Sequence, residues 1–342
     1  WATDGWNRMD SCYFAIPWFI SSRGYGLFVN CTGRLQVDVG VTHPGELRIE
    51  IPEAGVEVWG LHGAPEQIVA NYSQLVGRPE EVPEWTFQPW ISRNSYLGAY
   101  EVDRMITLME TNGLKASAVV LEAWEENLHN FRFETNRYPN PAGWIRGLHE
   151  RGYRVICWTT SSIWPVGSTY EEAKRRGFLV KDADGSEHVT RWLENGRKMD
   201  FRIPAARDFW RDLHLPLIAI GVDGFKTDGG EHMPDPWFHN EHPYHYQRAT
   251  LDAFAKAGRA GIAFARSGNP LTAGNSTFWG GDQLAEWRNL GVVVRGGLSA
   301  AWSGLFYWSH DVGGYSGTPT KDLYLRWLEI GIFSPMMQVH GD

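Results

Sequence analysis

The pattern of hydrophobic positions changes character near residue 77 of this 342-residue chain. Before that point, short apolar runs are separated by Gly, Pro, Asn and Thr, which is typical of antiparallel strands joined by turns. The runs that predict strands are 13–20, 24–30, 34–39, 46–51 and 56–61. We interpret residues 1–77 as the C-terminal part of an N-terminal β-sandwich domain.

Residues 78–84 contain two prolines and three glutamates, which predicts a linker. Beyond it, strand-like runs alternate with helical patterns, the signature of βα units around a parallel sheet. Strands are predicted at 87–91, 116–121, 153–158, 224–227, 261–265, 277–280, 304–308 and 335–339. Helices are predicted near 100–112, 140–151, 169–177, 205–219, 245–259, 284–302 and 321–331. The pattern predicts an α/β fold, a (β/α)8 TIM barrel over 78–342.

Two features depart from a regular barrel. Residues 178–200 are too polar for a barrel helix and predict a β-turn insertion. The chain begins at Trp1, without Met, inside a strand-like pattern, and ends at Asp342 directly after the eighth predicted strand. We therefore expect the barrel to lack its last helix here and the natural protein to continue on both sides.

Composition narrows the class of partner. The net charge is −8, which gives no support for a nucleic-acid or anionic-membrane partner. No apolar run reaches 18 residues, so no transmembrane helix is expected. The three cysteines are too few for a disulfide scaffold; a Cys12–Cys31 bond stays open, although free buried thiols are the main expectation. The 18 Trp suit a dense core or stacking on sugar rings. Oligomeric state and cellular compartment stay open.

The clearest chemistry lies in residues 224–231 and 276–282. Each begins as a short apolar or aromatic run, and Asp228 and Asp282 end these runs beside glycines. Barrel active sites lie at the carboxyl ends of the strands, so both carboxylates are expected to face one pocket. Facing carboxylates are the apparatus for cleaving a glycosidic bond. Polar, charged or aromatic residues follow the other predicted strands as well, which a purely structural barrel would not need.

Several segments of the chain resemble glycoside hydrolase family 31. Residues 225–231 resemble the nucleophile segment of the family, and residues 265–267 with 279–282 resemble its sugar-binding arginine and acid/base segments. Residues 307–314 are similar to a Ser-His-Asp-Ile-Gly-Gly segment, and residues 335–341 to the last barrel strand. Residues 21–26 resemble the end of the N-terminal sandwich. The resemblance covers almost the whole chain. It implies a hydrolase, a retaining α-glycosidase that removes a terminal α-linked sugar through a covalent glycosyl-enzyme.

The resemblance also implies the roles of the two acids. Asp228 would be the nucleophile, held ionised by Lys226 or Arg266. Asp282 would be the general acid and then the general base. It needs a raised pKa, which Trp279 and Phe278 could supply by excluding water.

Further residues are expected to bind the sugar. Arg266 and His310 would bind ring hydroxyls, and Trp279, with Trp158 or Trp164, would pack against the ring. Glu122 stands where many family members place an Asp that binds outer hydroxyls. The substrate-binding candidates are Glu122, Trp158, Trp164, Lys226, Arg266, Trp279, His310 and His340.

Other interpretations of these residues remain. Gly229 replaces the bulky Phe or Met usual in the family, which would leave space beside the nucleophile. Arg266 could instead form a structural ion pair with Asp228 or Glu231. His310 and Asp311 could be a buried hydrogen-bonded pair.

A cluster of histidines invites a metal site. It consists of His232, His239, His242 and His245. Its spacing does not match a zinc-hydrolase helix, and three prolines interrupt the region. No metal and no cofactor are therefore expected.

Two alternative functions stay open beside hydrolysis. A transglycosylase would use the same covalent intermediate, with a sugar hydroxyl in place of water. A non-catalytic carbohydrate-binding barrel would keep the aromatic rim and lose a carboxylate. The sugar itself is open among α-glucoside, α-xyloside, α-galactoside and N-acetylated substrates.

Overall fold

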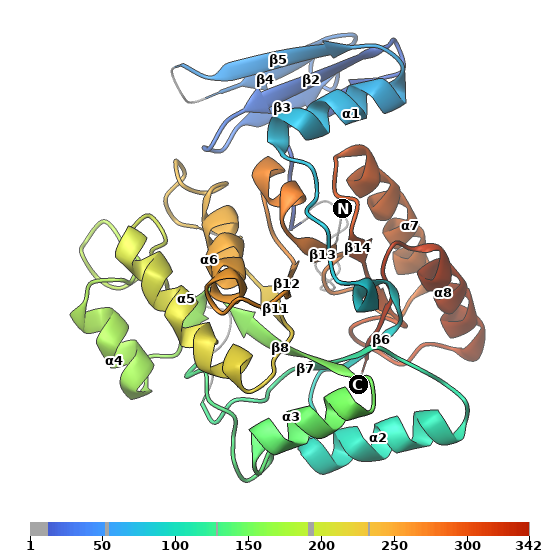
Figure 1. Cartoon of the computed structure of the whole chain (residues 1–342). Helices are drawn as coiled ribbons and strands as arrows, with labels where there is room; N and C mark the ends of the chain where they lie inside the picture. Colours follow the sequence, from blue (N-terminus) through green and yellow to red (C-terminus); the bar gives the residue numbers. More distant parts are fainter. Residues whose placement is uncertain (1–12, 52–54, 128, 191–194, 232, 342) are drawn as a thin grey trace.

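A computed structural model of the chain describes residues 13–51, 55–127, 129–190, 195–231 and 233–341. A small unit of antiparallel strands and one helix, blue in Figure 1, lies on one side of an α/β barrel that takes up the rest of the chain. The fold class predicted from the sequence is confirmed. The assignment of the first part to a β-sandwich domain ending at residue 77 stays a prediction.

The N-terminal unit contains the five strands that the sequence predicts. A three-stranded antiparallel sheet has the order β1 (Trp18–Ser21), β2 (Tyr25–Asn30), β5 (Glu57–His62), and a separate hairpin joins β3 (Gln36–Val39) to β4 (Leu47–Glu50). The sequence analysis did not predict one helix in this unit, between the last of these strands and the linker.

The missed helix is α1 (Pro65–Val76). Its signals are present in the sequence: a proline in the first turn, an acidic residue beside it, and Ile68, Tyr72 and Val76 at helical spacing. These side chains are buried, and the Tyr72 ring stacks on Trp18 with a centroid distance of 4.2 Å. The helix therefore covers the apolar face of the sheet, which has no second layer of its own there.

Eight parallel strand positions form the barrel. Its strands are β6 (Trp90–Arg93), β7 (Ala118–Leu121), β8 (Arg154–Thr160), β11 (Gly224–Asp228), β12 (Ile262–Ala265), β13 (Thr277–Trp279), β14 (Trp308–Ser309) with β15 (Asp311–Val312), and β16 (Gln338–Val339). The seventh position is split at His310: β14 pairs with β13, and β15 pairs with β16. The split seventh strand therefore connects β13 to β16 and closes the barrel.

Helices cover the outside of the barrel, at or within a few residues of the predicted positions (Figure 1). They are α2 (Ala99–Thr111), α3 (Pro141–Glu150), α4 (Gly167–Arg175), α5 (Pro204–Ala219), α6 (His242–Lys256), α7 (Trp287–Trp302) and α8 (Lys321–Phe333). Between β12 and β13 the described chain has only a short 3-10 helix, η2 (Pro270–Gly274). The predicted insertion is a β-turn region in which β10 (Arg197–Lys198) pairs with β9 (Ser162–Ile163).

Strand alternation divides the core into two layers. Along β7, Ala118 and Val120 join the cluster inside the barrel, whereas Val119 and Leu121 pack against the helices. Successive side chains point to opposite faces of a strand, so β7 buries both faces and is continuously apolar.

Three predicted strands begin later than expected. Residues Glu84–Phe87 form the 3-10 helix η1, so the first barrel strand begins at Trp90 rather than at Phe87. Gly304 has φ +81° and ends a turn after α7, so β14 begins at Trp308. The last strand begins at Gln338 rather than at Pro335.

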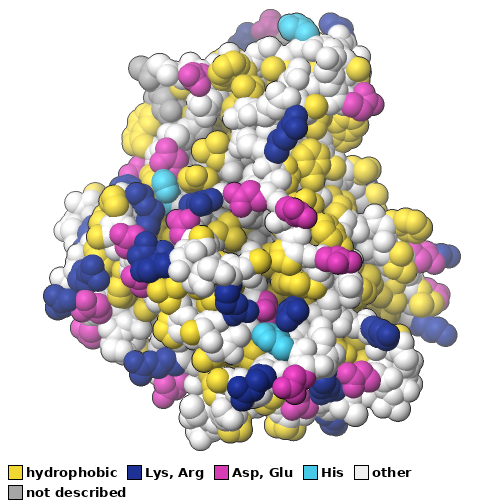
Figure 2. Space-filling model, in the orientation of Figure 1, with side chains coloured by type: hydrophobic (Ala, Val, Ile, Leu, Met, Phe, Trp, Pro, Cys, Tyr) yellow, Lys and Arg dark blue, Asp and Glu magenta, His cyan; other side chains and the backbone are white. Residues whose placement is uncertain are grey.

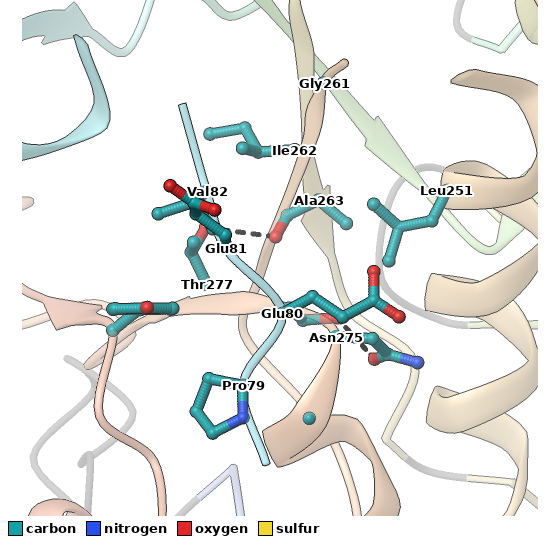
Figure 3. Close-up of a pocket in the computed structure, with 13 residues that line it drawn as sticks. Pro79, Glu80, Glu81, Val82, Leu251, Gly261, Ile262, Ala263, Asn275 and Thr277 are labelled. Carbon is teal, nitrogen blue, oxygen red and sulfur yellow. Dashed lines mark hydrogen bonds between the residues drawn. The ribbon is translucent and has the colours of Figure 1, made fainter. Parts of the chain in front are cut away.

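The linker crosses the amino-terminal end of the barrel. Figure 3 shows residues Pro79 to Val82 against the starts of β12 and β13, where they enclose a cavity of about 40 Å³. The Glu80 backbone N–H donates to the Gly274 carbonyl at 2.7 Å. This cavity lies at the opposite end of the strands from Asp228 and is not the active site.

The remaining predictions concern thiols and surface. Cys157 is a buried free thiol. Cys31 is buried, and its Sγ lies 3.4 Å from the Gly33 carbonyl oxygen; Cys12 lies outside the described residues, so a Cys12–Cys31 bond stays open. In the part of the chain that the structure describes, no helix is long and apolar enough to cross a bilayer. The face in Figure 2 carries acidic and basic side chains interspersed.

The split strand provides a test of the fold. A Cβ at Gly297 of α7 would collide with the ring of Trp308, whereas a Cβ at Gly291 of the same helix would meet only Arg295 Nη1 at 3.7 Å. We expect Gly297→Ala to lower the free energy of unfolding by about 2 kcal/mol through overpacking. Gly291→Ala, the control, should raise it by about 0.5 kcal/mol. Denaturant unfolding of both variants measures these changes, and equal changes in the free energy of unfolding would contradict the packing of Trp308 against Gly297.

Candidate active site

Asp228 is the last residue of β11 and points into the mouth of the barrel. Its Oδ2 accepts a hydrogen bond from Trp158 Nε1 at 2.8 Å, and its Oδ1 accepts from the Gly229 N–H at 2.8 Å. Arg266 Nη1 lies 3.0 Å from Oδ1. Gly229 has φ +68°, a conformation that strains any other residue, so backbone geometry accounts for the glycine at this position.

Arg266, directly after β12, joins the two predicted catalytic acids. Its Nη1 contacts Asp228 Oδ1 at 3.0 Å and Asp282 Oδ2 at 3.5 Å, and its Nη2 pairs with Glu231. The guanidinium is 5% exposed. Burial alone would lower the pKa of Arg266, but the surrounding carboxylates raise it, so the group stays charged.

This shared contact sets an upper limit on the distance between the two carboxylates. Two oxygens that touch the same nitrogen cannot be farther apart than the two contact distances added together. Retaining glycosidases need carboxyls about 5–5.5 Å apart, because one attacks the sugar directly, whereas inverting enzymes leave room for a water. The arrangement of Asp228 and Asp282 fits the short spacing.

The environment of Asp282 suits a proton donor. Burial raises its pKa to about 6; Arg266 opposes this shift, and the charge of Asp228 adds to it. Trp279 lies in the cluster inside the barrel, and its role in keeping water from Asp282 stays a prediction. Phe278 instead packs against Phe14 at 5.3 Å on the outer face of the strand, so its proposed role at Asp282 is not supported.

Lys226 forms its ion pair with Glu122 rather than with Asp228. Its Nζ lies 2.7 Å from Glu122 Oε1 and 4.8 Å from the centroid of the Trp279 ring. Burial raises the pKa of Glu122 to about 7, although Lys226 opposes the shift. Of the two cations predicted to hold Asp228 ionised, only Arg266 forms an ion pair with it among the described contacts.

The three predicted tryptophans occupy different positions. Trp158 of β8 binds the nucleophile candidate through its indole N–H and is 6% exposed. Trp279 is 1% exposed and packs on Phe264 at 5.1 Å, deep in the barrel. Trp164 follows β9 and is half-buried. Packing of these rings against a sugar stays a prediction.

The two predicted histidines differ in orientation. His310 accepts a hydrogen bond at Nδ1 from Trp327 of α8 at 3.0 Å, and its Nε2 lies 3.2 Å from Ser334 Oγ. It therefore faces the helices rather than the mouth. Its neighbour Asp311 points to the other side of the strand, where its Oδ1 accepts a hydrogen bond from Gln338 Nε2 at 2.5 Å. The structure does not bring His310 to the acids, which favours its interpretation as a buried hydrogen-bonded group.

His340, after β16, stays at the barrel mouth. Its Nδ1 lies 2.7 Å from Ser92 Oγ and its Nε2 lies 2.6 Å from Asn94 Oδ1, while Tyr315 stacks on its ring at 5.5 Å. Burial holds the pKa of His340 well below its usual value. The ring is therefore neutral and already hydrogen-bonded on both nitrogens, and its contact with substrate stays a prediction.

Sequence reasoning missed one residue at the site. Tyr13, from the segment before β1, places its ring 4.3 Å from the guanidinium carbon of Arg266. Burial and the charge of Asp282 raise the pKa of Tyr13, so its phenol stays protonated. Only the folded chain brings residue 13 beside residue 266, and no local signal marks it.

The structure describes three of the four histidines that suggested a metal site. His232 lies outside the described residues, and His242 packs between Phe201 and Phe238. Within the described ranges, no group of three or more His, Cys, Asp and Glu is arranged to hold a metal.

Comparison with known proteins agrees with this geometry. An isomaltosyltransferase of Sporosarcina globispora is 28% identical over 98% of this chain and 35% of its own length. An α-xylosidase of Emericella nidulans is 29% identical over 100% of this chain and 46% of its own length. The chain thus spans about half, or less, of the length of these relatives.

Solved structures show the same similarity. The cycloalternan-degrading enzyme from Trueperella pyogenes, in complex with a covalent intermediate, has a TM-score of 0.90 at 28% identity, covering 97% of this chain and 52% of that one. The same enzyme with isomaltose has a TM-score of 0.89 at 29% identity, covering 97% and 55%. The profile of the glycosyl hydrolases family 31 TIM-barrel domain matches residues 79–342. The chain therefore belongs to glycoside hydrolase family 31.

Proposed function

We propose that this chain carries the active site of a retaining α-glycosidase that removes a terminal α-linked sugar. One observation carries the proposal: a single nitrogen of Arg266 contacts both Asp228 and Asp282. Family membership supports it, and so does the covalent intermediate described for the Trueperella pyogenes enzyme.

In the first step, an oxygen of Asp228 attacks the anomeric carbon, and the bond to the leaving oxygen breaks. Asp282 gives its proton to that oxygen, so the aglycone leaves as a neutral alcohol. In the second step, Asp282 takes a proton from water, and the water oxygen displaces Asp228 from the sugar. Two inversions return the α configuration.

The substrate we propose is a short oligosaccharide with a terminal α-glucosyl unit. The relatives named for isomaltosyl transfer and α-xylosidase activity, and the neighbour seen with isomaltose, support gluco-configured sugars. Buried polar groups at the mouth, Glu122 with Lys226 and Asp311 with Gln338, suit neutral hydroxyls, which both donate and accept hydrogen bonds.

Transglycosylation is the second candidate, favoured by the relative named isomaltosyltransferase. It uses the same glycosyl-enzyme and replaces water by a sugar hydroxyl. A non-catalytic sugar-binding barrel is the remaining alternative, and the presence of both carboxylates on one arginine argues against it. No step needs a metal or cofactor.

Replacement of the nucleophile is the first test. We expect Asp228→Ala to lower kcat on aryl α-glucosides by at least about 1000-fold, because no covalent intermediate can form. Asp208→Ala, which removes an exposed carboxylate on α5, is the control and should keep full activity. Near wild-type turnover by Asp228→Ala would refute the assignment, and sugar binding by wild-type protein without turnover of any substrate would support the binding barrel.

The acid/base role predicts a dependence on the leaving group. Asp282→Ala should slow substrates with poor leaving groups far more than nitrophenyl glycosides, because only the former need a proton. Azide should rescue the variant by attacking the intermediate, giving an α-linked azide that NMR identifies. Equal losses on both substrate types would make Asp282 structural, and a β-linked azide would indicate a single displacement.

The raised pKa of Asp282 also predicts a stability effect. Its pKa is 3.8 ordinarily and about 6 in the folded chain, so the folded state holds this proton more tightly and loses stability as pH rises from about 4 to 6. Asp282→Asn removes the titration. It should gain up to about 3 kcal/mol in unfolding free energy above pH 6, and nothing below pH 4. Thermal unfolding at pH 4 and pH 7 measures this difference, and a gain that does not depend on pH would contradict it.

A further inference from the structure

The loop after β7 contains a buried carboxylate with no assigned role. Glu125 is 9% exposed. Its Oε2 accepts the backbone N–H of His129 at 2.6 Å, and its Oε1 accepts the backbone N–H of Phe131 at 2.9 Å. Both oxygens of the side chain are therefore used to hold the backbone of its own loop.

The backbone that Glu125 holds is in an unfavourable conformation. His129 has φ +65° and Phe131 has φ +59°, in the left-handed region that L-residues rarely adopt. Such conformations persist only where surrounding contacts fix them. The two hydrogen bonds that Glu125 accepts come from these same two residues, so its carboxylate helps to fix the turn at both.

The turn delivers one side chain to the active site. The His129 ring is buried and lies 5.5 Å from the ring of Trp158. The same loop holds Trp158 a second time, because Trp124 Nε1 donates to the Trp158 carbonyl at 2.8 Å. Trp158 in turn donates its indole N–H to Asp228 Oδ2.

We infer that Glu125 is a positioning residue for the nucleophile, acting through His129 and the indole of Trp158. The indole N–H fixes the rotation of the Asp228 carboxylate, and the His129 ring limits how far the indole can move. Glu125 itself touches neither acid among its described contacts. The inference rests on the proposed role of Asp228 and adds a control on its orientation.

Two substitutions test separately the contact of Glu125 with the loop backbone and the contact of the His129 ring with Trp158. In Glu125→Gln, one amide N–H must face one of the two backbone donors, so one hydrogen bond is lost. In His129→Gly, the backbone conformation is tolerated and the ring is removed. Glu126→Gln is the matched control, since Glu126 is exposed and, among the described residues, its side chain accepts a hydrogen bond only from the Asn130 amide, at 3.4 Å.

The first measurement needs no substrate. The indole N–H resonance of Trp158 in 15N-labelled protein, assigned by its absence in Trp158→Phe, reports the bond to Asp228. We expect Glu125→Gln and His129→Gly to shift this resonance and Glu126→Gln to leave it in place. An unchanged resonance in both test variants would overturn the inference. If Glu125→Gln does not fold, His129→Gly decides.

The second measurement is a double-mutant cycle on an aryl α-glucoside. Glu125→Gln should lower kcat about tenfold and change KM less than about twofold, because the ground-state contacts with sugar are untouched. In the Trp158→Phe background, the same substitution should cost less than about twofold. An equal loss in both backgrounds would overturn the inference. If the wild-type protein turned over no substrate but the variants shifted the resonance as expected, the proposed function would be refuted and the positioning role of Glu125 would stand.

Discussion

The guanidinium of Arg266 is the group on which the rest of the site depends. Three carboxylates with little exposure, Asp228, Glu231 and Asp282, meet there, and such a cluster is stable only around a cation that pairs with all of them. The planar fork of arginine lets one nitrogen serve Glu231 while the other bridges the two acids. The point charge of a lysine cannot hold that geometry. One side chain therefore keeps Asp228 and Asp282 close together, as the proposed double displacement requires.

Parts of the chain far apart in sequence hold that arginine. The parallel strands supply the acids, because inward positions on neighbouring strands end at the same edge of the barrel. Tyr13, from the segment before the N-terminal sheet, stacks on the guanidinium. Lys198, from the insertion after β8, donates to the Glu231 carbonyl at 2.8 Å and fixes that residue from behind. The active site is thus completed by segments outside the eight βα units.

This division explains what could be predicted from the sequence. Asp228, Asp282 and Arg266 follow strands with strong local patterns, so the barrel rule alone brings them together. The orientation of His310 could not be predicted, because a single step in strand register turns a side chain from the mouth to the helices. The strand segments on either side of His310 are only two residues long. Tyr13 could not be found, because its contact with Arg266 arises only from tertiary structure. The Glu125 contacts are local, but they depend on the positive φ angles of His129 and Phe131, which these residue types do not signal. Helix α1 was missed although its signals were local.

The charges at the mouth also bear on what the site can stabilise. Five carboxyls lie there, Glu122, Asp228, Glu231, Asp282 and Asp311, against the cations Lys226 and Arg266. Burial raises the pKa of Asp311 to about 8 and that of Glu122 to about 7, so the mouth resists further negative charge. Glycosidic cleavage passes through a sugar with oxocarbenium character, whose positive charge such a site favours over the neutral ground state. In the proposed reaction, the electrostatic imbalance that makes this cluster costly to bury therefore favours the positive charge of the transition state.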